Sequence, residues 1–198
     1  MLRRVFRCIN AFRAWYDRML FSVWLKLYGA EYSTLRIVGR PFLSVAKGGR
    51  LVIGEGFRMN SSPRGNAVGG SMKSVIRVEA GASLDIGKNV GVSSAVIVAT
   101  CGITIGDNVK IGGGAYIIDS DFHSLDAAER ADRTADRCNA RSAPVHIKEN
   151  ALIGARCMIL KGCVIGRNAI IGAGSVVTGH VPDNEVWAGN PARCIRRV

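Results

Sequence analysis

Pairs of small or aliphatic residues separated by one position recur twelve times along the chain, and the step between pairs is almost always six residues. Inward residues two apart indicate extended strands, and six residues are too few for a strand that turns and returns beside itself. The chain is therefore predicted to coil, with one short strand and one corner per hexad around an apolar column. The two runs of pairs are Leu84/Ile86, Val90/Val92, Val96/Val98, Ile103/Ile105, Val109/Ile111 and Ala115/Ile117, then Val145/Ile147, Ala151/Ile153, Cys157/Ile159, Cys163/Ile165, Ala169/Ile171 and Ser175/Val177.

Glycine follows many of these pairs, as at Gly106 and Gly154, and glycine accepts the backbone angles that a corner requires. Between residues 35 and 81 the repeat is irregular but still recognisable. Residues 60–74 contain no inward pair, so we expect a loop or a distorted corner there.

The segments ITIGDNVKIGGGA and VIGRNAIIGAGSVVTGHVP resemble the hexapeptide-repeat acyltransferases. This resemblance implies an all-β solenoid, a left-handed parallel β-helix with three hexads per coil, and the handedness comes from the resemblance alone. It covers residues 35–198, which we expect to form the β-helix acyltransferase domain after an N-terminal helix and connection in residues 1–34. Within it, residues 121–143 are an expected catalytic excursion loop, and residues 182–198 an expected coenzyme-binding loop and tail. The repeat is less specific for function, because other activities share it.

Residues 2–27 are predicted to form an amphipathic helix, with arginine and lysine crowding the polar side. Charges interrupt every apolar run, which disfavours a cleavable signal peptide or a spanning helix. The apolar face either caps the open end of the solenoid or lies on an anionic membrane with Trp15 and Trp24 near the interface, and both can hold at once. That face consists of Leu2, Phe6, Ile9, Phe12, Tyr16, Met19, Leu20, Val23 and Leu27.

The formal net charge is +12, which indicates an anionic partner such as a phosphorylated cofactor or an acidic lipid surface. Nucleic acid is not expected, because no reader motif or stacking platform occurs. None of the six cysteines shows CxxC spacing, and Cys157 and Cys163 occupy inward positions as small hydrophobes. We expect a reduced cytoplasmic setting, with peripheral attachment to the inner face of the cell membrane as an option.

Charge is dense in residues 121–143, where the repeat is interrupted. His123 stands there in DSDFHSLD, and Asp119, Asp121 or Asp126 could orient its ring. The stretch resembles the segment of sugar and serine acetyltransferases that carries their catalytic histidine, which implies that His123 is the general base. His146 and His180 are expected on the surface.

Zinc of the carbonic anhydrase type would require three convergent imidazoles. Only positions near multiples of 18 align along one edge of an 18-residue coil, and the three histidines lie 23 and 34 residues apart. No metal is expected.

The C-terminal VWAGNPARCIRRV resembles the loop and tail by which these transferases hold coenzyme A. Glycine-alanine corners expose backbone amides to the pantetheine arm, and guanidinium groups suit the nucleotide phosphates. Gly179 departs from the lysine common in the family, which puts one phosphate contact in doubt. The arginines could instead be a solvated tail, and Trp187 could stack on the coenzyme or pin the tail. Matched residue by residue, the coenzyme contacts are Ala155, Ala173, Thr178, Arg193 and Arg196.

The resemblance implies an acetyl-CoA-dependent O-acetyltransferase that acts on a sugar hydroxyl, similar to the maltose, galactoside and capsular-polysaccharide enzymes. It also implies a homotrimer with its site between subunits and a role in surface polysaccharide biosynthesis. Transfer would be direct, with His123 as base and the Ala155 N–H at the oxyanion, because the core cysteines face inward. The alternatives are an N-acetyltransferase of a nucleotide-linked amino sugar and a non-catalytic membrane-associated scaffold. Candidate acceptor contacts are Asn60, Ser93, Asp119 and Asp121, with Arg64, Ser94 and Arg141 as weaker candidates.

Overall fold

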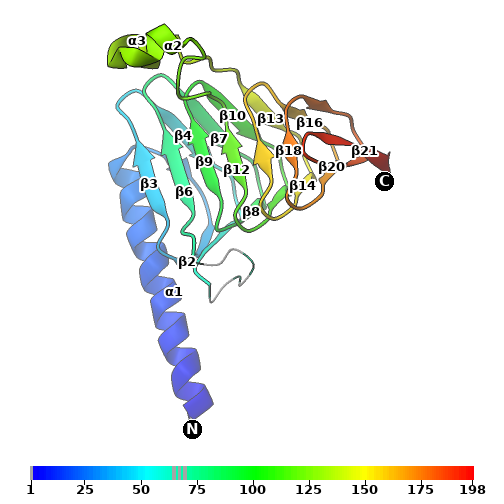
Figure 1. Cartoon of the computed structure of the whole chain (residues 1–198). Helices are drawn as coiled ribbons and strands as arrows, with labels where there is room; N and C mark the ends of the chain where they lie inside the picture. The colour runs from blue at the N-terminus through cyan, green and yellow to red at the C-terminus, as the bar shows by residue number, and fades with distance from the viewer. Residues whose placement is uncertain (1, 64–65, 67, 69–70) are drawn as a thin grey trace.

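The structure is a computed structural model that describes residues 2–63, 66, 68 and 71–198 (Figure 1). Helix α1 (Leu2–Leu27) leads into a solenoid in which each strand from β1 to β17 pairs in parallel with the third strand after it. One coil therefore contributes one strand to each of three sheets, as the hexads predict. Residues 62–74 separate two strands, so the expected loop begins two residues later than predicted; part of this stretch lies outside the described residues.

Sheet A contains β1 (Glu31–Tyr32), β4 (Arg50–Ile53), β7 (Ser83–Ile86), β10 (Gly102–Ile105), β13 (Val145–Ile147), β16 (Val164–Ile165) and β19 (His180–Val181). Sheet B contains β2 (Leu35–Gly39), β5 (Phe57–Ser61), β8 (Gly91–Ser93), β11 (Lys110–Ile111), β14 (Leu152–Ile153), β17 (Ile170–Ile171), β20 (Glu185–Gly189) and β21 (Ala192–Arg197). Sheet C contains β3 (Phe42–Val45), β6 (Val75–Val78), β9 (Val96–Ala99), β12 (Tyr116–Ile118), β15 (Met158–Ile159) and β18 (Val176–Val177).

The inner column consists of the predicted hexad residues with one exception. At β9 the buried residues are Ile97 and Ala99, so the prediction that Val96 and Val98 face inward is wrong. Ser94, at φ 42, turns the corner before β9 with one residue fewer than the six-residue repeat provides. This shifts the alternation of inward and outward side chains in β9 by one position. The thiols of Cys157 and Cys163 are buried in the column, as expected.

Asparagines line the corner between sheets A and B. The Nδ2 of Asn108 donates to Asn150 Oδ1 at 3.1 Å, Asn150 donates to Asn168 at 3.1 Å, and Asn168 donates to Asn184 at 2.8 Å. All four have φ between 57° and 61°, a conformation that asparagine tolerates better than other residues with a side chain. The ladder ties the C-terminal coils together along this corner.

Helix α1 extends over the predicted residues 2–27, but it packs on the solenoid with a different face from the predicted apolar one. Phe21 and Leu25 are 3% and 0% exposed, whereas Leu27 is 71% exposed. Asp17 fixes the same side, since its carboxylate accepts from the Gly39 N–H at 3.0 Å.

The excursion between β12 and β13 is not a plain loop. It contains two short helices, α2 (Ala127–Ala131) and α3 (Arg133–Asn139), which project from the corner between sheets C and A (Figure 1). Asp126 caps α2 and Asp132 caps α3, because their carboxylates accept backbone N–H groups of the first helical turn. The density of charge therefore reflects helix caps as well as a solvated surface.

Candidate active site

Asp119 anchors the start of the excursion. One oxygen of its carboxylate accepts from the N–H and the hydroxyl of Thr100, both at 2.7 Å, and the other accepts from the N–H groups of Cys101 and Gly102 at 2.9 and 2.7 Å. The side chain is completely buried and ties β12 to the corner of the preceding coil. The Asp119 carboxylate is therefore bonded to Thr100, Cys101 and Gly102 rather than to His123, and its contact with an acceptor stays a prediction.

Backbone hydrogen bonds close the stem of the excursion. Asp121 N–H donates to Arg141 C=O at 3.0 Å, and Ala143 N–H donates to Asp119 C=O at 3.0 Å. Lys161 Nζ lies 2.8 Å from Asp121 Oδ1, while the buried Asp121 Oδ2 has no hydrogen-bond partner in the described part of the chain. Contact between Asp121 and an acceptor stays a prediction.

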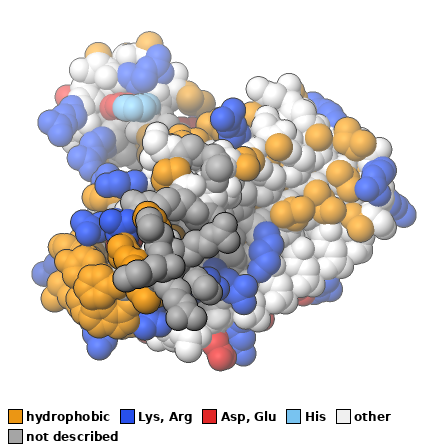
Figure 2. Space-filling model, turned by 90° about the horizontal axis from the view of Figure 1, so that it is seen from below, with side chains coloured by type: hydrophobic (Ala, Val, Ile, Leu, Met, Phe, Trp, Pro, Cys, Tyr) orange, Lys and Arg blue, Asp and Glu red, His pale blue; other side chains and the backbone are white. Residues whose placement is uncertain are grey.

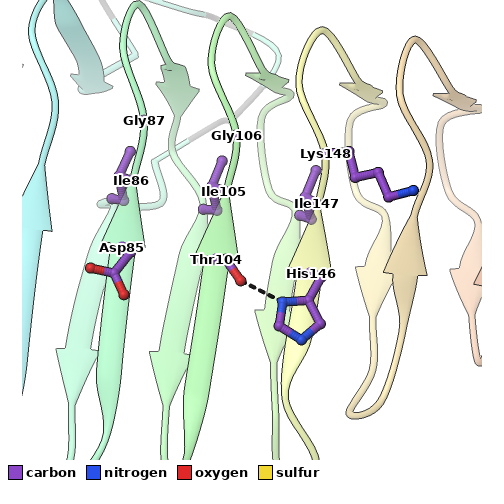
Figure 3. A pocket seen from close by; sticks show the side chains of 9 residues that line it. All are labelled: Asp85, Ile86, Gly87, Thr104, Ile105, Gly106, His146, Ile147 and Lys148. Atoms are coloured by element: carbon purple, nitrogen blue, oxygen red, sulfur yellow. Dashed lines mark hydrogen bonds between the residues drawn. The ribbon is translucent and has the colours of Figure 1, made fainter.

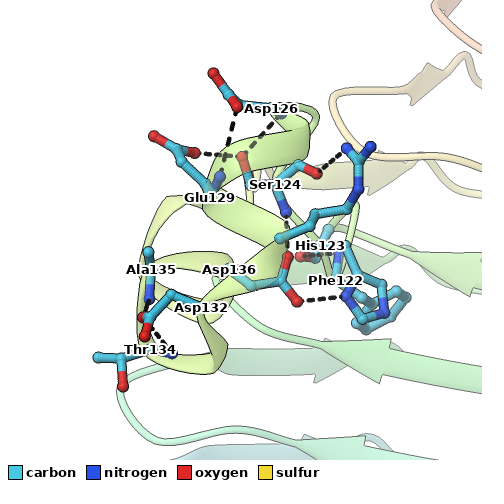
Figure 4. A network of polar contacts seen from close by, with 11 residues as sticks. Phe122, His123, Ser124, Asp126, Glu129, Asp132, Thr134, Ala135 and Asp136 are labelled. Carbon is cyan, nitrogen blue, oxygen red and sulfur yellow. Dashed lines mark hydrogen bonds and ion pairs between the residues drawn. The ribbon is translucent and has the colours of Figure 1, made fainter.

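His123 is paired with Asp136, a residue that the sequence did not single out (Figure 4). The distance from His123 Nδ1 to Asp136 Oδ2 is 2.7 Å, and Ser124 N–H donates to Asp136 Oδ1 at 2.8 Å. A carboxylate can only accept, so Nδ1 carries the hydrogen and Nε2 is left with its lone pair. The His123 side chain is 70% exposed, so this lone pair is accessible.

The pKa of Asp136 lies below its usual value, chiefly because of the hydrogen bond from His123 and then that from the Ser124 N–H. The carboxylate is thus held in the ionised form that fixes the tautomer of the imidazole. Asp126, offered as an orienting residue, instead accepts from Ala128 N–H at 2.7 Å as the cap of α2. A cap signal could have revealed α3, and with it the position of Asp136 in the first turn.

The other predicted residues fall on two different corners. Ala155 and Ala173 follow β14 and β17, at the corner between sheets B and C. Asn60 and Ser93 are register partners at the end of β5 and β8, so they belong to the same corner. Thr178 follows β18 and lies on the corner between sheets C and A, in line with the excursion.

At the corner between sheets B and C the coils stack closely and leave two backbone N–H groups without an acceptor, so we call it the bare corner. A Cβ on Gly112 would come within 2.6 Å of Ala155 N, and a Cβ on Gly154 within 2.6 Å of Ala173 N, so only glycine fits these positions. Within the described residues, neither the Ala155 nor the Ala173 N–H has a hydrogen-bond acceptor. These donors are available to an amide-rich ligand or a developing oxyanion.

The C-terminal tail is a β-hairpin of β20 and β21 whose Asn190–Pro191 peptide is cis. Arg193 and Arg196 are exposed, and each bonds only a local carbonyl, at 2.9 and 3.1 Å. Neither forms an ion pair within the described part of the chain. Trp187 packs against the core and donates to Glu185 at 2.8 Å, an arrangement that pins the tail.

One chain does not bring the two corners together. A strand of sheet C with its flanking residues separates them, about five residues or roughly 16 Å of extended chain. His123 and Thr178 lie where the strands of sheet C end, and Ala155 and Ala173 lie where the strands of sheet C begin. Arg64 lies outside the described residues.

A shallow groove of about 490 Å³ lies on the outer face of sheet A (Figure 3). His146 Nδ1 is 2.5 Å from Thr104 Oγ1 there, and the neighbouring strand places Asp85 beside Thr104. His146 and His180 are exposed, as expected. Among the described residues no group of three His, Cys, Asp or Glu side chains is placed to hold a metal. In this groove His146 is paired with a hydroxyl group, whereas His123 is paired with a carboxylate.

Comparison with known proteins shows which class of protein the chain resembles. Residues 144–179 match the bacterial transferase hexapeptide model of six repeats, and residues 84–118 match the hexapeptide repeat of succinyl-transferase. Together with the parallel pairing of the strands, these matches confirm the left-handed β-helix and show hexapeptide repeats in both segments.

Within that class the chain is similar to sugar O-acetyltransferases, which confirms the predicted resemblance. It is 34% identical over 119 residues to galactoside O-acetyltransferase of Escherichia coli (strain K12), which is 60% of this chain and 56% of the relative. The Lactococcus lactis enzyme of the same name is 33% identical over 114 residues, 57% and 55% of the two chains. This chain thus spans about half the length of the curated relatives it matches.

Two solved structures extend the comparison. A galactoside acetyltransferase in complex with coenzyme A is 26% identical with a TM-score of 0.51, covering 84% of this chain and 65% of that one. AntD, an N-acyltransferase from Bacillus cereus in complex with dTDP and 3-hydroxybutyryl-CoA, has a TM-score of 0.64 at 18% identity and covers 89% and 87%. The second likeness concerns the fold alone.

Proposed function

We propose that the protein transfers an acetyl group from acetyl-CoA to a hydroxyl of a saccharide, with His123 as general base. The observation that carries this proposal is the pairing of the exposed His123 with the ionised Asp136 at 2.7 Å. A base near neutral pH needs a free lone pair and a fixed tautomer, and this pair provides both. The similarity to galactoside O-acetyltransferases supports a sugar as acceptor.

Transfer proceeds in one displacement. Nε2 of His123 takes the proton of the acceptor hydroxyl as its oxygen attacks the thioester carbonyl, and the resulting imidazolium returns that proton to the departing thiolate. The two core cysteines are disfavoured as nucleophiles, because burial raises the pKa of the Cys163 thiol to about 11 and also raises that of Cys157. Asp136 stabilises the imidazolium between these two steps.

The coenzyme is assigned to the corner between sheets B and C and to the tail. The N–H groups of Ala155 and Ala173 face the pantetheine arm, with Ala155 as donor to the oxyanion, and Arg193 and Arg196 bind the phosphates. Thr178 is assigned to the same ligand from the other corner. Asn60 and Ser93, on the corner that carries Ala155, are the acceptor candidates that this placement favours, ahead of Asp121.

Such a site requires a second subunit. Since one chain holds its base and its bare corner roughly 16 Å apart, a neighbour must present its own corner to His123, and a closed ring of three copies does this three times. The homotrimer is therefore part of the proposal, as is a role in surface polysaccharide biosynthesis.

Acetyl-CoA turnover with detection of the released thiol, run against a panel of saccharides, tests the proposal. Release that depends on a hydroxyl acceptor and falls about 10²- to 10⁴-fold in His123→Ala supports it. A preference for a nucleotide-linked amino sugar would indicate N-acetyl transfer instead. Absence of turnover with every acceptor, or full turnover without His123, would overturn the mechanism.

A further inference from the structure

Helix α1 carries two apolar stripes, and only one of them covers the solenoid. Phe21 and Leu25 bury themselves against the first coil, and Tyr28 packs beside them. Asp17 lies on this side and accepts from the N–H of Gly39 and the Nε of Arg40. The end of the apolar column is therefore already closed without the larger stripe.

Most of the second stripe points away from the solenoid, and at its edge Ile9 and Phe12 line an open groove with Tyr16 and Arg40. Its side chains are largely exposed, with Phe12 at 64% and Leu27 at 71%. Figure 2 shows hydrophobic side chains gathered at the end of the molecule where α1 lies, with lysine and arginine around them. A continuous exposed apolar surface of this kind indicates an interaction site. The stripe and its edges comprise Val5, Phe6, Ile9, Phe12, Trp15, Met19, Val23, Trp24 and Leu27.

The positive charge of α1 indicates which kind of partner its exposed stripe binds. The sequence of α1 contains six arginine or lysine residues and one acidic residue, Asp17, which is already bonded on the solenoid side. Arg13 and Lys26 are exposed and border the outward stripe. Pairing with α1 of a second copy would bring two positive surfaces together, whereas an anionic lipid surface complements them. No helix in the described part of the chain is long and apolar enough to cross a membrane.

We propose that the outward face of α1 docks on an anionic lipid bilayer, with the helix lying flat at the headgroup boundary. Phe12, Val23 and Leu27 enter the acyl region, while Arg13 and Lys26 extend to the lipid phosphates. Trp15 and Trp24, both about half exposed, lie at the interface. This docking is independent of acetyl transfer.

The fold then sets the orientation of the whole molecule. Helix α1 crosses the first coil, so the solenoid stands away from the bilayer with β21 at its far end (Figure 1). Helices α2 and α3 lie toward the end of the solenoid that α1 covers (Figure 1). The excursion that carries His123 is therefore on the membrane side.

Co-sedimentation with vesicles tests the docking. The full chain should bind vesicles of phosphatidylcholine with phosphatidylglycerol far better than phosphatidylcholine alone, and added salt should weaken binding. Phe12→Asp and Val23→Asp should each lower binding about tenfold or more, because each removes one inserted side chain. Asn10→Asp is the matched control: it adds the same charge one heptad before Asp17, on the same face of α1 as Asp17 and away from the exposed stripe, and should change binding less than about threefold.

Fluorescence gives a second readout. Trp187→Phe leaves Trp15 and Trp24 as the indoles, and brominated lipids should quench them strongly in this variant but much less when Phe12→Asp is added to it. Equal binding to both kinds of vesicle, equal effects of Phe12→Asp and Asn10→Asp, or no quenching would overturn the proposal. A change in oligomeric state in Phe12→Asp without any lipid binding would assign the face to a second copy instead.

Discussion

The substitution Asp136→Asn would disturb the candidate base while leaving the fold intact. The amide oxygen of the new side chain could still accept from the Ser124 N–H, but its amide nitrogen would face His123 Nδ1, which lies 2.7 Å from the Asp136 carboxylate in the parent. That nitrogen is a donor, so Nδ1 must become the acceptor and Nε2 must carry the hydrogen. The imidazole would then have no lone pair directed at the acceptor hydroxyl.

The loss should be about 10- to 100-fold in kcat, since the His123–Asp136 contact is a charge-assisted hydrogen bond of about 1.5 to 3 kcal/mol. The KM for acetyl-CoA should be nearly unchanged. Because Asp136 acts through His123, combining Asp136→Asn with His123→Ala should cost no more than His123→Ala alone. Thiol release with the identified acceptor measures all three variants.

Asp132→Asn is the matched control for Asp136→Asn. It removes a carboxylate from the same short helix, yet asparagine caps a helix as well as aspartate does, so α3 should persist. Activity of Asp132→Asn should stay within about twofold of the parent. The reasoning is refuted if Asp136→Asn is as active as the parent, or if both variants lose activity equally.

The remaining predictions concern the tail, the trimer, the asparagine ladder and one thiol. Arg196→Ala should raise the KM for acetyl-CoA about 10- to 100-fold but leave acetyl-pantetheine, which lacks the nucleotide phosphates, unaffected; equal damage with both donors would remove Arg196 from the coenzyme site. Mixing His123→Ala with Ala173→Glu subunits after joint refolding should restore roughly a quarter of the sites, and no recovery would place each site within one chain. Asn150→Ala should lower the free energy of unfolding by about 2 kcal/mol and Asn150→Gly by less, as urea titration would show, because glycine accepts the φ of 61°. Desolvation and the charge of Asp119 raise the pKa of the exposed Cys101 thiol to about 11. At pH 8 maleimide should therefore label Cys101 about 10²-fold more slowly than an ordinary thiol, and the rate should rise up to pH 11. Rapid labelling of Cys101 at pH 8 would contradict this prediction.

Periodicity was sufficient to predict the coils because each inward side chain obeys the same two constraints, alternation along a strand and stacking on the next coil. Ile105 and Ile147 illustrate this, since they are register neighbours and both are buried. The error at Val96 and Val98 arose where one corner is shorter, a change that the local sequence VSSAVIVA does not mark. Every residue of that segment is small or aliphatic, so either phase would look equally apolar.

Helix α1 shows a different limit of sequence reasoning. The spacing of apolar residues was enough to identify the largest apolar stripe of the helix. Which stripe packs on the solenoid, however, depends on contacts with residues outside the helix. Phe21 and Leu25 make that contact, because Asp17, about one turn before Phe21, fixes the rotation of the helix through Gly39. No pattern within residues 2–27 contains that information.

Candidate chemistry lies where the repeat is broken, and this explains both what was found and what was missed. His123 could be identified because a histidine in an otherwise charged excursion is conspicuous, whereas Asp136 looked like one of many solvated carboxylates. Its role depends on two helix caps that bring residues 13 positions apart within 2.7 Å. The bare corner at Ala155 and Ala173 is likewise fixed by the coil, which places it one strand away from His123 in the same chain. A solenoid with three strands per coil thus presents the candidate base and the candidate backbone donors on separate edges, and under the proposed function another copy of the chain brings these edges face to face.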